Sequence, residues 1–318
     1  MDPQLPDDIA ELAAAARRAL SDPGLDRARR AMAGDDSAST EVDSILRQLG
    51  LTELDPGEHH QALAAAHLAL ESGRTGNVVP VAAAFSARSI GRDGLLQAIP
   101  ARGDRVVVEH GRFAASQGLA TGGVTVDGRL VGLALEAHVP EAMLVPFART
   151  ARRVGSSADG YAHAFALYET LAAFASLGAA YVACDLARDH LKNRIQFGKP
   201  LASQQSLQHR FADMLLAVAG LNELAHYTLW RLYAAPEKAV IDALGLRVQH
   251  VEAVRSVFRN GHQIHAAVGF CDEHAMSVAS RAVRFAQYLP LTYDETLDAL
   301  IRHLPDGWDA LFDIAPFA

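Results

Sequence analysis

The chain has 318 residues and a formal net charge of −8 at pH 7; half of its residues are hydrophobic and 21% are charged. This length and composition are typical of a globular protein with a large buried core and one to three domains. The acidic balance, without a clustered basic stripe, argues against a nucleic-acid-binding surface.

The beginning of the chain, MDPQLPDDIAEL, is acidic and lacks the basic and apolar regions of a signal peptide. We find no uninterrupted run of about 18 apolar residues that would indicate a membrane span. Cys184 and Cys271 lie far apart and have no CxxC partner, which indicates reduced, structural thiols. We therefore expect a cytoplasmic protein.

The first ninety or so residues predict a helical domain, residues 1–92. Alanine-rich segments suggest helices over Ile9–Leu20, Glu41–Leu49 and Glu58–Ser72, separated by glycine and proline.

The pattern then changes to short, β-branched runs, which predict a small β-domain over residues 93–157 with its sheet between Leu95 and Val154. Asp127-Gly128 lies between two such runs and predicts a type I′ hairpin turn.

From Gly160 the sequence is helical again, which predicts a bundle domain over residues 158–318. The first helix, Tyr161–Asn193, is apolar on most faces, as expected for a central bundle helix. Further helices are expected over Ser203–Tyr233 and Lys238–Val268, with shorter ones up to Leu304. The fold class is therefore mainly α with a small β-domain.

Three motifs at characteristic spacing then stand out. RIQFG (Arg194 to Gly198) connects the first two bundle helices, Gln205 and FADM (Phe211–Met214) lie on the second, and QIHAAVGF (Gln263–Phe270) ends the third. Together with the element order, they resemble the acyl-CoA dehydrogenase family, most clearly in the C-terminal half.

The resemblance implies an FAD shared between two subunits. In that family the isoalloxazine ring is held by one subunit, while the pyrophosphate and adenosine are held by a neighbour's arginine, glutamine and glycine turn. Arg194, Phe197, Gln205 and the turn Gln263, Ala266, Ala267 and Gly269 match this donated half. A guanidinium suits diphosphate oxygens, so Arg194 is expected to face a cofactor in another chain, with Phe197 packing to hold it.

Ordinary structural roles compete with each of these assignments. Arg194 near a helix C-terminus is favourable against the helix dipole, and Gln205 and Gln263 are also compatible with solvated positions. Ala266 and Ala267 replace two glycines of the family pattern, which adds two methyl groups where backbone would meet phosphate. His262 and His265 share one helix face, but no HExxH or Cys/His grouping exists, so no metal site is expected.

The other half of a flavin site is missing from the sequence. The family's Thr-Glu, Gly-Ser-Asp and Trp-Ile-Thr segments have no counterpart between Ile90 and Gly155, and the sheet is about half the expected size.

The catalytic base is also in question, because dehydrogenation needs a carboxylate to remove the α-proton of the acyl group. TYDET (Thr292–Thr296) lies near the family position of this base and offers Asp294. The competing and favoured interpretation is a capping box, with Thr292 as N-cap and Glu295 at the third helical position.

A second family position for the base is the start of the first bundle helix, where spacing from Arg194 leads to Tyr168. A phenol with an ordinary pKa of about 10 is a poor base. The adjacent Glu169 would point about 100° away around the helix. Neither position supplies a convincing carboxylate.

This asymmetry predicts a non-catalytic subunit of a heteromeric, FAD-dependent acyl-CoA dehydrogenase, inactive alone and paired with a full-length catalytic subunit in a heterotetramer. By analogy, the expected substrate is a bulky acyl-CoA such as a steroid side-chain thioester. The enzyme would then act in lipid metabolism and steroid degradation, with electron-transfer flavoprotein as the electron acceptor. The alternatives are a self-sufficient dehydrogenase using Asp294 or Glu169, a structural bundle protein without flavin, and a flavin-dependent monooxygenase on the same fold.

Overall fold

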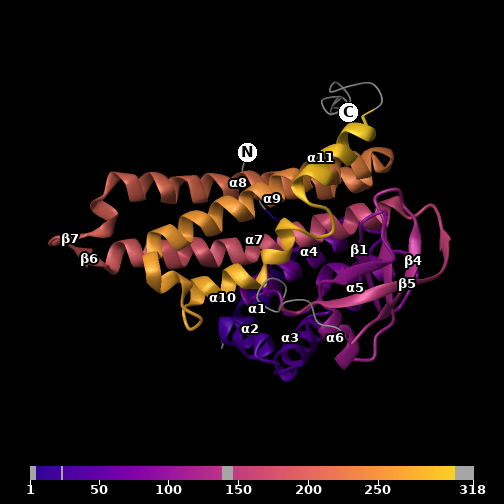
Figure 1. Ribbon diagram of the computed structural model, residues 1–318, viewed down its shortest axis with the longest axis horizontal. Coiled ribbons are helices and arrows are strands. Elements are labelled where there is room, and N and C mark those ends of the chain that lie inside the picture. Colours follow the sequence, from indigo (N-terminus) through magenta and orange to yellow (C-terminus); the bar gives the residue numbers. More distant parts are fainter. Residues whose placement is uncertain (1–4, 23, 138–145, 305–318) are drawn as a thin grey trace.

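The computed structural model describes residues 5–22, 24–137 and 146–304, which are mostly helical with a small five-stranded sheet and a two-stranded hairpin (Figure 1). Three long helices run along the molecule, the sheet lies at one end of them, and the N-terminal helices pack along their side (Figure 1). The predicted fold class, mainly α with a small β-domain, is confirmed.

Five helices form the N-terminal part: α1 (Asp7–Leu20), α2 (Leu25–Met32), α3 (Ser37–Gln48), α4 (His59–Arg74) and α5 (Val81–Arg88). The three helices predicted from alanine-rich segments correspond to α1, α3 and α4. The sequence pattern missed α2 and α5, because eight residues are too few to establish a helical period.

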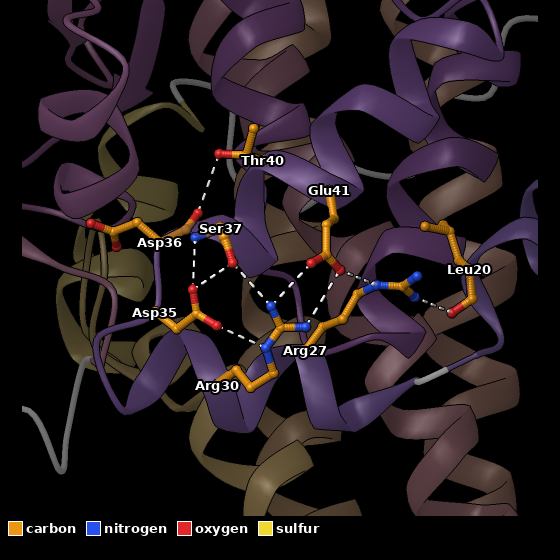
Figure 2. A network of polar contacts seen from close by, with 8 residues as sticks. All are labelled: Leu20, Arg27, Arg30, Asp35, Asp36, Ser37, Thr40 and Glu41. Atoms are coloured by element: carbon orange, nitrogen blue, oxygen red, sulfur yellow. Dashed lines mark hydrogen bonds and ion pairs between the residues drawn. The ribbon is translucent and has the colours of Figure 1, made fainter.

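An ion-pair network fixes α2 against α3 (Figure 2). Arg30 Nε lies 2.8 Å from an Asp35 carboxylate oxygen, and Arg30 Nη2 lies 3.0 Å from Glu41 Oε1. Arg27, which is 6% exposed, donates from Nη1 to the carbonyl oxygen of Leu20 at 2.9 Å. The hydrogen bonds from Arg30 lower the pKa of Glu41. Charged contacts therefore hold a helix that apolar periodicity does not reveal.

A mixed five-stranded sheet follows: β1 (Leu95–Ala98), β2 (Arg105–Val108), β3 (Thr121–Val124), β4 (Leu130–Leu135) and β5 (Arg149–Ala158). Its strand order is β1-β3-β4-β5-β2; β1 and β3 pair in parallel, whereas the other pairs are antiparallel. A short helix, α6 (Gly111–Ser116), connects β2 to β3.

The turn at Asp127-Gly128 is not the predicted type I′ turn. That type requires positive φ at both central residues, but of these two only Gly128 has it, at 75°. Gly128 N donates to Thr125 O at 2.8 Å, and Thr125 N donates to Arg129 O at 3.0 Å. The connection is a three-residue loop, a type I turn followed by a left-handed glycine.

The bundle contains α7 (Ala162–Asn193), α8 (Gln205–Ala234) and α9 (Ala239–His265), followed by α10 (Ala275–Ala282) and α11 (Tyr293–Arg302). The predicted bundle helices are therefore present. The third ends at His265 rather than Val268, because the chain turns at Ala266 into the 3-10 segment η3 (Ala266–Phe270). Another 3-10 segment, η4 (Arg284–Gln287), precedes α11.

Burial of α7 defines the core of the protein. By length and composition α7 could cross a membrane, but 78% of its most apolar window is buried inside the protein. Its neighbours include α4, α5, α8, α9 and α10. This surrounding is what a central bundle helix with apolar residues on most faces requires.

Two glycines bring the backbones of α4 and α7 into direct contact. A Cβ on Gly178 would lie 1.9 Å from Leu70 O, and a Cβ on Gly73 would lie 1.8 Å from Ala175 O. No side-chain rotation relieves such overlaps, because the opposing atoms belong to backbone. The N-terminal helices therefore dock on the bundle only if these positions lack a side chain.

We expect Gly178→Ala to lower the free energy of unfolding by about 3 kcal/mol or more, because the added methyl group forces α4 away from α7. Gly245→Ala on α9 is the matched control: no atom lies within 4 Å of its new Cβ, so better helix propensity should stabilise the protein by up to about 1 kcal/mol. Urea denaturation followed by circular dichroism measures both. Wild-type stability in Gly178→Ala would contradict the close packing.

Candidate functional site

The loop after α7 exposes Arg194 at the end of the bundle opposite the sheet (Figure 1). Arg194 is the C-cap residue, with extended backbone, and its carbonyl oxygen accepts from Leu201 N at 2.9 Å, which closes the loop. Among the described residues, the Arg194 side chain makes no hydrogen bond or ion pair. The guanidinium is therefore available to a ligand or another chain.

A tight hairpin carries Phe197 at its tip. Its strands are β6 (Ile195–Gln196) and β7 (Lys199–Pro200). Phe197 and Gly198 have φ values of 53° and 76°, the signature of a type I′ turn. This conformation suits asparagine or glycine and is strained for phenylalanine, so local folding does not explain the residue.

The expectation that Phe197 packs to hold Arg194 is wrong for the described chain. Phe197 is 95% exposed, and the neighbouring Ile195 is 54% exposed. A hairpin of two-residue strands has no buried face into which the ring could turn. The ring instead exposes an apolar surface at this end of the bundle.

Gln205 is the first residue of α8 and is exposed at the same end. The N-cap residue, Gln204, provides no side-chain hydrogen bond to the first turn of α8. Backbone N–H groups of this turn and the positive end of the helix dipole are therefore open to an anion, close in the chain to Arg194.

The turn after α9 supplies the third part of the predicted half-site. Gln263, Ala266 and Ala267 are exposed, whereas Gly269 is buried. Ala266 has φ 53° and ψ −143°, a conformation that glycine adopts far more readily than alanine. A Cβ on Gly269 would lie 2.8 Å from His265 Cβ, so this position needs glycine. The turn keeps a glycine-type backbone at Ala266 despite the alanine side chain.

Arg194 also lines a groove of about 390 Å³, together with Leu186, Asp189, His190, Asn193, His265 and His274. The ring of His265 lies 4.6 Å from that of His190 and 4.8 Å from that of His274, centroid to centroid. Burial lowers the pKa of His190 and of His274. This histidine cluster was not predicted from the sequence. The feature that could have indicated it is His190, which lies one helical turn before Arg194.

A second polar group is buried between the end of β2, α7 and α9. Tyr168 Oη donates to Glu109 Oε2 at 2.8 Å, and Asn77 Nδ2 donates to Glu109 Oε1 at 3.2 Å. Arg247 Nε lies 3.8 Å from Glu169 Oε2, an ion pair longer than a hydrogen bond. The Glu169 oxygens find no hydrogen-bond partner among the described residues.

Burial raises the pKa values of the two carboxyl groups, Glu109 and Glu169. It raises the pKa of Glu109 to about 8, although the Tyr168 hydrogen bond acts in the opposite direction. It raises the pKa of Glu169 to about 7, opposed by the Arg247 guanidinium. Beside Glu109 and Tyr168 lies a cavity of about 10 Å³, which is enough for about one water molecule.

Neither candidate base lies in a ligand-sized pocket. Asp294 is exposed in the first turn of α11, and Thr292 and Glu295 form the capping box that the sequence favoured. Glu169 is 1% exposed and faces Arg247. The structure thus brings Arg194 and the turn after α9 to one end of the bundle, where Gln205 also lies, and leaves Asp294 and Glu169 apart from them.

Comparison with known proteins relates the helical bundle to one family. Residues 162–290 match the C-terminal domain of acyl-CoA dehydrogenases. Bovine mitochondrial isobutyryl-CoA dehydrogenase is 31% identical over 114 residues, which are 36% of this chain and 27% of that protein. The matched segment thus spans about a quarter of the length of this relative.

Solved structures extend the similarity to nearly the whole chain. A variant of the Tcur3481–Tcur3483 steroid ACAD superposes with a TM-score of 0.72 at 18% identity, covering 96% of this chain and 99% of that one. The ChsE4–ChsE5 complex from Mycobacterium tuberculosis gives a TM-score of 0.66 at 16% identity, with the same coverage. The chain has the acyl-CoA dehydrogenase fold, and its residues 162–290 match the C-terminal domain of that family, as the sequence resemblance indicated.

The buried carboxyls predict a pH dependence of stability. Between their ordinary value near 4.5 and the raised values of about 7 and 8, the folded protein holds protons that the unfolded chain has released. Buried histidines such as His67, His110 and His250 have lowered pKa values and act in the opposite direction below about pH 6.5, so the free energy of unfolding should fall as pH rises from about 7 to 8. Glu109→Gln removes one of these protons and should flatten the slope, as measured by urea midpoints at several pH values. Glu11→Gln, at an exposed position of α1, is the control; equal slopes in all three proteins would contradict the prediction.

The strained turn predicts a stabilising substitution. Ala266→Gly should raise the free energy of unfolding by about 1 kcal/mol, because glycine adopts φ 53° without steric cost. Ala267→Gly, one residue later and without positive φ, should instead destabilise by up to about 1 kcal/mol. Denaturant unfolding of the two variants compares them directly, and a less stable Ala266→Gly protein would show that the turn is not strained.

Proposed function

We propose that this chain is the non-catalytic subunit of a heteromeric, FAD-dependent acyl-CoA dehydrogenase and donates the pyrophosphate-binding half of the flavin site to a catalytic partner. The observation that carries the proposal is the contrast between its two sets of polar residues. Arg194, Gln205 and Gln263 are exposed, whereas Glu169, a candidate base, is buried against Arg247.

The exposed residues suit the diphosphate of FAD. The Arg194 guanidinium is free to form two charge-assisted hydrogen bonds to phosphate oxygens. Gln205 and Gln263 offer amide donors, and the glycine-type backbone at Ala266 allows close approach. Hydride acceptance during α,β-dehydrogenation is the chemistry that FAD supplies when bound. The role of this chain is to hold and orient the cofactor, not to move a proton.

The interior supports the view that proton removal belongs to the partner. A general base must lie within hydrogen-bond reach of the proton that it abstracts. Glu109 and Tyr168 hydrogen-bond each other beside a cavity of only about 10 Å³, which no acyl chain can enter. Asp294 lies on the surface in the capped turn of α11. In the described part of the chain, no carboxylate among these candidates combines access with a pocket.

The similar structures support the heteromer and suggest its substrate. One is named as a steroid ACAD of two components, and the other is a complex of two named chains. By analogy, the substrate would be a bulky acyl-CoA such as a steroid side-chain thioester, and the assembly a heterotetramer with two copies of each subunit. An electron-transfer flavoprotein would then reoxidise the cofactor, and a cytoplasmic location is expected.

The test is flavin content after expression of this chain alone and together with a candidate full-length acyl-CoA dehydrogenase partner. The isolated chain should carry little flavin, and the co-purified pair one FAD for each pair of unlike chains. Arg194→Ala in this chain should weaken retention of FAD by about tenfold or more, because charge-assisted hydrogen bonds are lost.

The control is Arg188→Ala, which removes an exposed arginine of the same helix that pairs with Asp185 and Asp189. It should leave the flavin content unchanged. A full complement of FAD and dehydrogenase activity in the isolated chain would refute the heteromer and favour a self-sufficient enzyme. Unchanged flavin in the Arg194→Ala complex would instead favour a purely structural subunit.

A further inference from the structure

A second groove, of about 330 Å³, lies between α9 on one side and α10 and η4 on the other. It shares no lining residue with the groove that contains Arg194. Four arginines line it: Arg255, Arg259, Arg281 and Arg284. In a protein with a net charge of −8, so dense a group of cations is a local reversal of the overall charge.

The acidic neighbours balance only half of this charge. Arg255 pairs with Glu252 at 3.0 Å, and Arg281 pairs with Asp272 at 3.3 Å. Asp272 is 82% exposed, so its pairing is weak. Arg259 and Arg284 are exposed and have no ion pair or hydrogen bond from their side chains to any described residue.

One donor in the groove is both buried and unsatisfied. Arg281 Nε is buried and has no hydrogen-bond partner among the described residues, and the Arg281 side chain is 25% exposed. A buried N–H without an acceptor is costly. An anionic group bound in the groove would neutralise the exposed guanidinium groups of Arg259 and Arg284.

An aromatic surface lines the same groove. The rings of His262 and Phe270 stack at 4.4 Å between centroids with an interplanar angle of 15°. Phe270 is 67% exposed, which leaves an outer ring face open to a flat group. Ser280 and Gln287 add neutral polar groups to the wall. Arginines can bind the phosphates of a nucleotide, and an exposed aromatic ring beside them can stack on its planar base.

We infer that this groove binds the ADP moiety of a nucleotide, with the phosphates held by Arg259, Arg281 and Arg284 and the adenine ring against Phe270. The volume lies in the range of small-ligand sites, which favours a nucleotide over a protein segment. Two sources share this chemistry: free ADP, and coenzyme A, whose ADP moiety carries an additional 3′-phosphate that adenosine 3′,5′-bisphosphate reproduces. Phe270 belongs to the same turn as the flavin half-site, but the arginines of this groove lie outside that half-site, so nucleotide binding here stands whether or not that function holds.

The experiment is isothermal titration of the full chain with ADP, adenosine 3′,5′-bisphosphate and inorganic pyrophosphate at low salt. ADP should bind saturably at one site, and the Arg259→Gln/Arg284→Gln double variant should weaken binding about tenfold or more. Phe270→Ala should reduce ADP affinity to that of pyrophosphate. Tighter binding of the 3′,5′-bisphosphate than of ADP would identify coenzyme A as the source, and the reverse order would identify the free nucleotide.

Two controls separate this site from the half-site. Arg302→Gln removes an exposed arginine of α11 outside the groove and should leave affinity unchanged. Arg194→Ala should also leave it unchanged. The inference is overturned if neither ADP nor the 3′,5′-bisphosphate binds saturably up to about 1 mM. It is equally overturned if the double variant binds like wild type, or if Arg194→Ala alone abolishes binding, which would place the nucleotide in the half-site.

Discussion

The enclosure of α7 by neighbouring helices is the constraint on which the rest of the molecule depends. Ala162–Asn193 is one continuous helix, and Gly178 lets it approach α4 at backbone distance. Because the helix is buried along most of its length, its polar residues at one end, Tyr168 and Glu169, must find partners inside the protein. At the other end Arg194 emerges into solvent. A single helix thereby links a closed interior to an open, cationic end.

An interior closed to ligands and an exposed end with Arg194 are both expected if the chain works with a partner. Glu109 and Tyr168 satisfy one another and leave room for about one water molecule, so this region serves folding and excludes ligands. Phe197 has a strained backbone and is 95% exposed, which costs stability in the isolated chain. Such strain at an exposed tip is expected where a residue serves an interface rather than the fold of its own chain.

Periodicity and motif spacing predicted the long elements well, because α7, α8 and α9 have many turns over which an apolar pattern can accumulate. The same reasoning missed α2, which depends on Arg30 and its acidic partners, and misassigned the turn at Asp127-Gly128, whose type depends on one backbone angle. The capping box at Thr292 was predictable because it is local. The pairing of Glu109 with Tyr168 was not, because it joins residues 59 positions apart.

On the proposed function, Arg194 completes a flavin site in another chain. A cryo-electron microscopy structure of the co-purified complex tests it most directly through the position of the FAD diphosphate. The account predicts that the isoalloxazine ring is held by the partner subunit, with Arg194 within hydrogen-bond distance of the diphosphate oxygens. An FAD held entirely by one chain, with Arg194 facing solvent, would contradict it.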